Sequence, residues 1–475
     1  MSSSATLTEA ATTGAPAAVR LGAFAATADV PDAARAAARA AVQDTIGVAL
    51  AGAGEPAARI VQRVLSADGG PGPSTVLGAG SAGPSSAALA NGTAAHALDF
   101  DDMCWVTLAH PSAPLVAASL AAGEAADAPG RTLLDAYVVG FEVEAALGTV
   151  MNPTHYERGW HGTATLGTIG AAAAASRVLG LDAEATARAL SIAASEASGL
   201  KENFGTMAKP LQGGLAARNG VLAALLARDA FTASPRAIDG PQGFLVAMQS
   251  AGRDLSAAID ELGRRWEIVE GGITVKLYPS CAATHPTIDT LLDLRREAGI
   301  DPATVEAVEV DVDPVVPTVL IHDRPATGLE GKFSLHYCAA AALAFGRVGI
   351  DTFEPDAMRD PAVARLVPRV TMRADDRLGR EVPPLTEARV TVRLADGRML
   401  ERSVRGARGY PERPASPAEL DGKFLSCARR IVSAEAADGA LDFLRNLDLA
   451  PSVRGLVPRL AQGAAAAAAA APQLV

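Results

Sequence analysis

The stretch Val308-Glu309-Val310-Asp311-Val312 departs from the pattern of the sequence before it. Valines alternate there with carboxylates, which is the period of a half-buried β-strand. From about residue 30 to residue 252 the period is helical instead, and Val42, Ile46 and Leu50, for example, recur every four residues. In this region helices are expected at 113–127, 132–151, 165–181, 183–199, 215–230 and 243–251. The sequence therefore predicts an all-helical part followed by a part that contains strands.

More strands and helices are predicted around this stretch. Residues 389–404 favour a hairpin, because Asp396-Gly397 supplies the residues that a tight turn needs. Residues 370–372 predict another short strand, and helices are expected at 285–299 and 334–346. Strands and helices thus alternate through this part of the chain.

From Pro417 the pattern returns to helices, near 417–432 and 436–446, with Ser416 as a helix cap. We therefore expect a mainly α protein, with a large all-helical domain formed from both chain ends and a smaller inserted α+β lid domain. The expected boundaries are 17–269 and 409–460 for the helical domain, 270–408 for the lid, and 1–16 and 461–475 for loose tails.

Composition and charge exclude several classes of function. The 475 residues are 49% hydrophobic but only 4% aromatic, which favours closely packed helices. The net charge of −11 argues against nucleic acid as a partner. The four distant cysteines predict neither a disulfide framework nor an iron–sulfur cluster. The N-terminal residues do not resemble a signal peptide and no apolar run reaches membrane length, so we expect a cytoplasmic protein that does not bind membranes.

Lysine is rare in this sequence. There are 42 lysines and arginines together, and five of them are lysines, at positions 201, 209, 276, 332 and 423. Because arginine serves as the general surface cation here, a retained lysine suggests a role for a compact charge, such as anchoring an anion or moving a proton.

Three polar motifs contain histidine. Residues 91–102 contain His96 and three carboxylates, without the spacing of a calcium loop, and we expect the carboxylates to orient an imidazole and His96 to be structural. His110 precedes a helix N-terminus, where anions are favoured. His161 has glycines on both sides, so that a ligand can come near.

Three further motifs contain lysine. In residues 205–212, Pro210 disfavours a helical conformation for Lys209, which predicts a loop there. Residues 276–285 place many polar groups at the expected domain junction, including a Cys/His pair that no thiol-protease signature supports. Lys332 opens a predicted helix.

Together, in this order, these motifs resemble those of the superfamily of 2-methylcitrate dehydratase and cis-aconitate decarboxylase (MmgE/PrpD), over roughly residues 20–450. The resemblance implies a helical domain with an inserted α+β lid, a homodimer, and no metal or organic cofactor. The site residues that it implies are Asp99, His110, His161, Lys209 and Lys276.

The resemblance also shows departures. Cys281 stands where the decarboxylases carry histidine, and His285 is shared with other relatives. Met103 stands where relatives usually have threonine, and Gln212 where many have histidine. These changes suggest a less charged or differently shaped substrate. The expected substrate-binding residues are Lys332, Cys281, His285, Tyr278, Gln212 and Met103.

The resulting hypothesis is a cofactor-independent lyase that dehydrates or decarboxylates a small carboxylate. Lys209, Lys276 and Lys332 would hold carboxylates, His161 and His110 would move protons, and Asp99 would orient an imidazole. Two alternatives remain open. One is an epimerase, such as the iminodisuccinate epimerase-like members, acting at a carbon next to a carboxylate; the other is a catalytically silent anion-binding protein.

Overall fold

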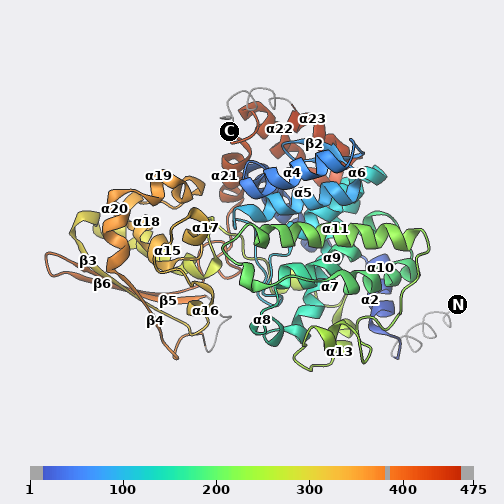
Figure 1. Ribbon diagram of the computed structural model, residues 1–475, viewed down its shortest axis with the longest axis horizontal. Helices are drawn as coiled ribbons and strands as arrows, with labels where there is room; N and C mark the ends of the chain where they lie inside the picture. The colour runs from blue at the N-terminus through green and yellow to red at the C-terminus, as the bar shows by residue number, and fades with distance from the viewer. Residues whose placement is uncertain (1–13, 380–385, 462–475) are drawn as a thin grey trace.

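The computed structural model describes residues 14–379 and 386–461 and is mainly helical, as the sequence predicts (Figure 1). Nearly all of the two expected tails lies outside these residues. Among the described residues, no helix combines the length and apolar character needed to cross a bilayer.

Long helices fill the first half of the chain, close to their predicted positions. They are α2 (Ala17–Thr27), α3 (Asp32–Gly52), α4 (Pro56–Asp68), α5 (Pro84–Ala97), α6 (Ser112–Ala126), α7 (Gly130–Met151), α9 (Gly162–Val178), α10 (Ala183–Glu196) and α11 (Ala208–Arg228). One small hairpin, formed by β1 (Ser74–Val76) and β2 (Gly80–Ala82), was not predicted, because three-residue strands carry almost no periodic signal.

Small residues bring these helices into close contact, as the composition predicted. A Cβ atom added to Gly92 of α5 would lie 2.9 Å from the Cα of Gly214 in α11. A Cβ on Gly140 of α7 would lie 2.8 Å from the carbonyl oxygen of Gly170 in α9. Only glycine, which has no Cβ atom, lets the two backbones come this close, so both helix crossings depend on glycine.

Two predicted helices differ from the observed ones. The helix expected at 215–230 begins at Ala208, so Lys209 and Pro210 lie inside its first turn and the predicted loop is wrong. Proline is tolerated there because the first N–H groups of a helix have no intrahelical acceptor. The helix expected at 243–251 is reduced to α12 (Phe244–Ala247).

The predicted strands are confirmed and form one four-stranded sheet in the order β4-β3-β5-β6. They are β3 (Val305–Val312), β4 (Val370–Ala374), β5 (Glu387–Leu394) and β6 (Met399–Arg405). Val308, Val310 and Val312 are fully buried beneath α15 (His285–Ala298) and α18 (Leu335–Phe345), which pack against the sheet (Figure 1). The alternation in the sequence thus marks one covered face.

Both chain ends contribute to the same helical body. The helices α21 (Pro417–Ala428) and α22 (Ala434–Arg445) pack against α3, and their apolar residues join those of residues 17–268 in one hydrophobic cluster (Figure 1). Ser416 caps α21 by accepting a hydrogen bond from Glu419 N, as predicted. A second hydrophobic cluster is formed by residues between 278 and 410 and by Met103. The exact domain boundaries and the lid stay predictions.

Candidate active site

The candidate site begins in the turn that follows α5. Asp99 adopts a left-handed conformation with φ of 52°, which aspartate tolerates better than most residues. After this turn, Asp102 accepts hydrogen bonds from the backbone and hydroxyl of Ser112, which begins α6. The turn is therefore held against the start of the next helix, with His110 between them.

Two lysines bind the carboxylate of Asp99. Lys209 donates to Oδ1, and Lys276 donates to Oδ2 and to the backbone oxygen of Asp99, both at 3.0 Å. Burial alone would raise the pKa of Asp99, but the two ammonium groups hold it well below its usual range. The residue is therefore an anion that keeps two lysines in place.

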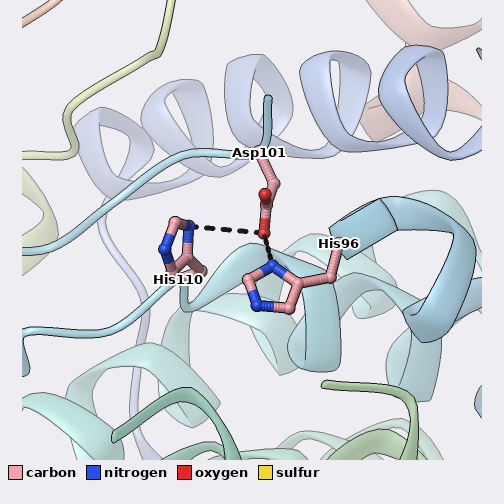
Figure 2. Close-up of side chains that lie close together, drawn as sticks. All are labelled: His96, Asp101 and His110. Atoms are coloured by element: carbon pink, nitrogen blue, oxygen red, sulfur yellow. Dashed lines mark hydrogen bonds and ion pairs between the residues drawn. The ribbon is translucent and has the colours of Figure 1, made fainter. Parts of the chain in front are cut away.

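Asp101 orients two imidazoles (Figure 2). His96 Nδ1 lies 2.7 Å from Asp101 Oδ2, and His110 Nδ1 lies 3.5 Å from the same oxygen. The nearest imidazole nitrogen of His110 lies 3.9 Å from Asp99. Both oxygens of Asp99 bind lysines, so Asp101 is the carboxylate that lies closer to the imidazoles, and the expected role of Asp99 toward an imidazole stays a prediction.

These three side chains could also hold a metal ion, since their ligand atoms lie within 4.8 Å of one another. Two ligands that are each about 2.1 Å from one tetrahedral ion would lie about 3.4 Å apart. The 2.7 Å between His96 and Asp101 is instead a hydrogen-bond distance. The hydrogen bond joins His96 and Asp101, whereas His110 Nδ1 lies beside the same carboxylate without a hydrogen-bond partner among the described residues.

Gln212 determines which nitrogen of His161 carries the proton. The amide nitrogen of Gln212 donates to Leu200 O, so its Oε1 faces His161 Nδ1 at 2.6 Å as an acceptor. In the neutral imidazole, Nδ1 therefore carries the hydrogen and Nε2 a lone pair. Nε2 is buried and has no hydrogen-bond partner within the described part of the chain. It is the nitrogen left free to accept a proton.

The imidazoles of this region are neutral near pH 7. Burial lowers the pKa of His161 and of His110 well below the usual range, and it also lowers the pKa of His96. For His110 the carboxylate of Asp101 opposes this effect, but burial and the nearby ammonium groups outweigh it. Neutral imidazoles can accept protons, as a base must.

A small cavity connects these groups. Its volume is ≈ 30 Å³, counted as the space that the centre of a water-sized sphere can reach. Its polar lining comes from Asp99, His110, His161 and Lys209, and the other lining residues are Met103, Leu108, Tyr156, Phe204, Cys281, Ala282, Val319 and Phe333. Larger cavities exist elsewhere, one of ≈ 490 Å³ beside α7, but none of the site's histidines or acidic groups lines that one.

Three long helices start next to the cavity. His110 precedes the first residue of α6 by two positions, His161 caps α9, and Lys209 is the second residue of α11. The N-terminus of a helix carries partial positive charge and free N–H groups. Together with Lys209, these helix ends favour a bound anion.

Other predicted residues lie away from the cavity. Lys332 donates to Leu98 O and Pro279 O at 2.7 and 2.8 Å, and Lys276 is fully buried behind Asp99. Lys332 lines a separate cavity of ≈ 200 Å³, and the predicted contact of both lysines with substrate stays a prediction.

Tyr278 and His285 form part of a buried network next to the sheet. Tyr278 donates to Asp289 and accepts a hydrogen bond from Arg408 at 2.8 Å, while His285 packs against the Tyr278 ring. Neither lines the cavity, so their expected contact with substrate is not supported by their positions. They stabilise the segment that carries Cys281.

Cys281 does line the cavity, as expected, but not as a nucleophile. All four cysteines are free and buried, and burial raises the pKa of Cys281 to about 11. A thiol that stays protonated is a small apolar wall residue.

The aromatic wall of the cavity was not predicted from the sequence. Phe204 and Phe333 each place a ring 5.5 Å from Lys209 Nζ, and Tyr156 lies nearby. A signal existed, because aromatic residues are scarce in this chain and Phe333 directly follows Lys332. Their meeting at one lysine, however, depends on the fold.

Comparison with known proteins agrees with this architecture. The MmgE/PrpD N-terminal domain family matches residues 20–256, and the MmgE/PrpD C-terminal domain family matches residues 278–449. The cis-aconitate decarboxylase-like protein oryM of Aspergillus oryzae is 30% identical over 401 residues, which cover 79% of this chain and 82% of that protein.

Two further relatives are similar over comparable lengths. The cis-aconitate decarboxylase of Homo sapiens is 27% identical over 77% of each chain. That of Aspergillus terreus is 26% identical over 85% of this chain and 86% of its own. With both family domains matched in order, the chain belongs to the MmgE/PrpD family.

Proposed function

We propose that this protein is a lyase that removes CO₂ or water from a small carboxylate by acid–base chemistry, without a metal or organic cofactor. The observation that carries this proposal is the free, buried Nε2 of His161 beside the ammonium group of Lys209 on one cavity. The names of the relatives, which are cis-aconitate decarboxylases, support the same class of reaction.

Lys209 would bind the substrate carboxylate. Its Nζ has three hydrogens, and the described contacts use one of them, to Asp99. The starts of α6, α9 and α11 add favourable partial charge. Negative charge that develops next to the carboxylate would be stabilised by groups already in position.

His161 and His110 would move the protons. In dehydration, His161 Nε2 takes a proton from the carbon next to the carboxylate, the electron pair forms the double bond, and the β-hydroxyl leaves as water with a proton from His110. In decarboxylation, the C–CO₂ bond breaks, the electron pair stays on carbon, and a protonated imidazole returns a proton to it. His110 is neutral in the free site, because burial and the nearby ammonium groups outweigh Asp101. It would take up its proton from solvent when the anionic substrate binds, since a second negative charge beside it favours the imidazolium.

The test is a proton NMR assay in D₂O with the purified full-length chain and a panel of small mono-, di- and tricarboxylates, each with and without a β-hydroxyl. Loss of water or CO₂ supports the proposal. Deuterium exchange without net loss supports an epimerase on the same site. No product and no exchange on any compound contradicts an enzymatic role for this site with the compounds tested.

The homodimer expected from the family resemblance is part of this proposal and is checked by light scattering on the same sample. A monomer at micromolar concentration would contradict it.

A further inference from the structure

One tyrosine of this chain does not use its hydroxyl group in the fold. The sequence contains five tyrosines. Four of them have a hydroxyl with a hydrogen-bond partner: Tyr137, Tyr278, Tyr337 and Tyr410. The fifth, Tyr156, is contacted through its ring and its backbone oxygen, but no partner of its hydroxyl is among the described residues. Because tyrosine hydroxyls inside proteins usually find a partner, this one is available to a ligand.

The hydroxyl of Tyr156 faces the cavity. Tyr156 belongs to α8 (Thr154–Glu157) and is one of the lining residues. Burial raises the pKa of its hydroxyl, and so do negative charges on Cys281 and Asp99, which line the same cavity. Since these charges act on the phenolic oxygen, that oxygen lies on the cavity side of the ring. A hydroxyl that stays protonated can donate a hydrogen bond into the cavity.

The ring of Tyr156 is held in place from outside the cavity. Lys201 Nζ lies 3.5 Å from the centre of the ring and donates to the backbone oxygen of Tyr156 at 3.1 Å. The preceding residue, His155, is fixed at both ring nitrogens, which lie 2.6 Å from Met248 O and 2.7 Å from Thr165 Oγ1. A ligand that accepts a hydrogen bond from this ring therefore meets a group already in position, and little side-chain entropy is lost on binding.

Tyr156 would complement Lys209. The ammonium group of Lys209 offers one point of attachment to a carboxylate, as argued above. The hydroxyl of Tyr156 offers a second donor on the same cavity. A substrate held at two points has a defined orientation, which is what a base such as His161 requires to reach one particular proton.

We infer that Tyr156 is a substrate-binding residue whose hydroxyl donates a hydrogen bond to an oxygen atom of the substrate. This inference deepens the proposed function and rests on its assignment of this cavity as the substrate site. The acceptor is an oxygen of the carboxylate that Lys209 holds or a hydroxyl oxygen on a neighbouring carbon, and the test below distinguishes the two.

Binding without turnover tests the inference. Isothermal titration calorimetry at fixed pH and ionic strength compares propionate and 3-hydroxypropionate, which differ by one hydroxyl group. Tyr156→Phe is expected to bind 3-hydroxypropionate about tenfold more weakly than the wild type does. An equal weakening for propionate assigns the hydrogen bond to the carboxylate, whereas an unchanged affinity for propionate assigns it to the substrate hydroxyl. Unchanged affinity for both acids overturns the inference.

Tyr337→Phe is the matched control, because it removes a hydroxyl that donates to Thr352 O away from the cavity. It should leave both affinities unchanged but lower the free energy of unfolding in urea titrations, whereas Tyr156→Phe should leave that free energy unchanged. A loss of stability in Tyr156→Phe as large as in the control would show that the fold uses this hydroxyl, and would also overturn the inference.

The two proposals can fail separately. Because calorimetry needs no reaction, absence of lyase activity would not alter the comparison between Tyr156→Phe and the wild type. If neither acid binds to the wild type at millimolar concentration, the assignment of the cavity as the substrate site is wrong, and the inference is overturned with it.

Discussion

The two sides of the cavity differ in chemistry and in their origin along the chain. Its charged and imidazole groups come from residues 99–209, at the ends of closely packed helices. The lining residues after position 280 are Cys281, Ala282, Val319 and Phe333, from the part of the chain that contains the sheet. The proton-transfer groups thus come from one side, which also contributes Met103, Leu108, Tyr156 and Phe204 to the lining. The other side contributes no charged or imidazole group to the lining. The predictions below test this division, from the largest expected effect to the smallest.

Removal of the base should have the largest effect. His161→Gln is expected to lower kcat by about 10²–10⁴-fold, the usual contribution of a general base, measured on the substrate that the NMR panel identifies. His336→Gln, a histidine of α18 with no contact to the cavity, is the control and should retain activity. Equal activity of the two variants would remove His161 from the mechanism.

Removal of Lys276 should affect stability strongly. Lys276→Met leaves the buried Asp99 with one ammonium partner, so the free energy of unfolding should fall by about 3–5 kcal/mol in urea titrations followed by circular dichroism. Lys201→Met is the control, because Lys201 is only partly buried and bonds a backbone carbonyl. A loss no larger than in the control would mean that Lys276 contributes little to the fold.

A substitution on the apolar side of the cavity should change which substrate is preferred but leave proton transfer intact. Val319→Ala enlarges the cavity and is expected to raise kcat/KM for a longer arm by about tenfold relative to a shorter one, the order of effect of a methylene in a pocket. Val315→Ala, four residues away and exposed, is the matched control. If Val319→Ala lowers kcat equally for all substrates, the division between the two sides is wrong.

The pH profile should depend on Gln212. Because burial lowers the pKa of His161 well below its usual 6.5, the neutral base persists below that pH, and activity is lost only as the pH falls through the lowered value. Gln212→Glu keeps the acceptor but adds a charge that favours the imidazolium. The acid limb of kcat/KM should therefore move to higher pH by about one unit. If the acid limb of kcat/KM does not move, it reports the titration of a group other than His161.

Metal removal should have the smallest effect. Dialysis against a chelator is expected to leave kcat unchanged, because the distances at His96 and Asp101 are those of a hydrogen bond. Activity that disappears and returns with one added metal would show that the three-residue group in Figure 2 binds an ion.

Much of this arrangement could be predicted from local signals. The alternation at Val308–Val312, the turn at Asp396-Gly397 and the cap at Ser416 all correspond to observed elements. Six of the predicted residues line the cavity: Asp99, Met103, His110, His161, Lys209 and Cys281. The prediction was wrong at Lys209-Pro210, where two local preferences of proline conflict. Proline disfavours a helical conformation for the residue before it, but it is tolerated in the first turn of a helix, and here the second preference prevails.

The sequence by itself determined the mainly helical class, the position of the strands and which rare lysines and histidines are candidates for chemistry, because periodicity, turns and composition are local properties. The tertiary structure alone decided that Asp99 binds lysines while Asp101 orients imidazoles, and that Lys332 faces carbonyls outside the cavity. These features depend on groups far apart in the chain, so burial and pairing, which set their protonation and their role, exist only after folding.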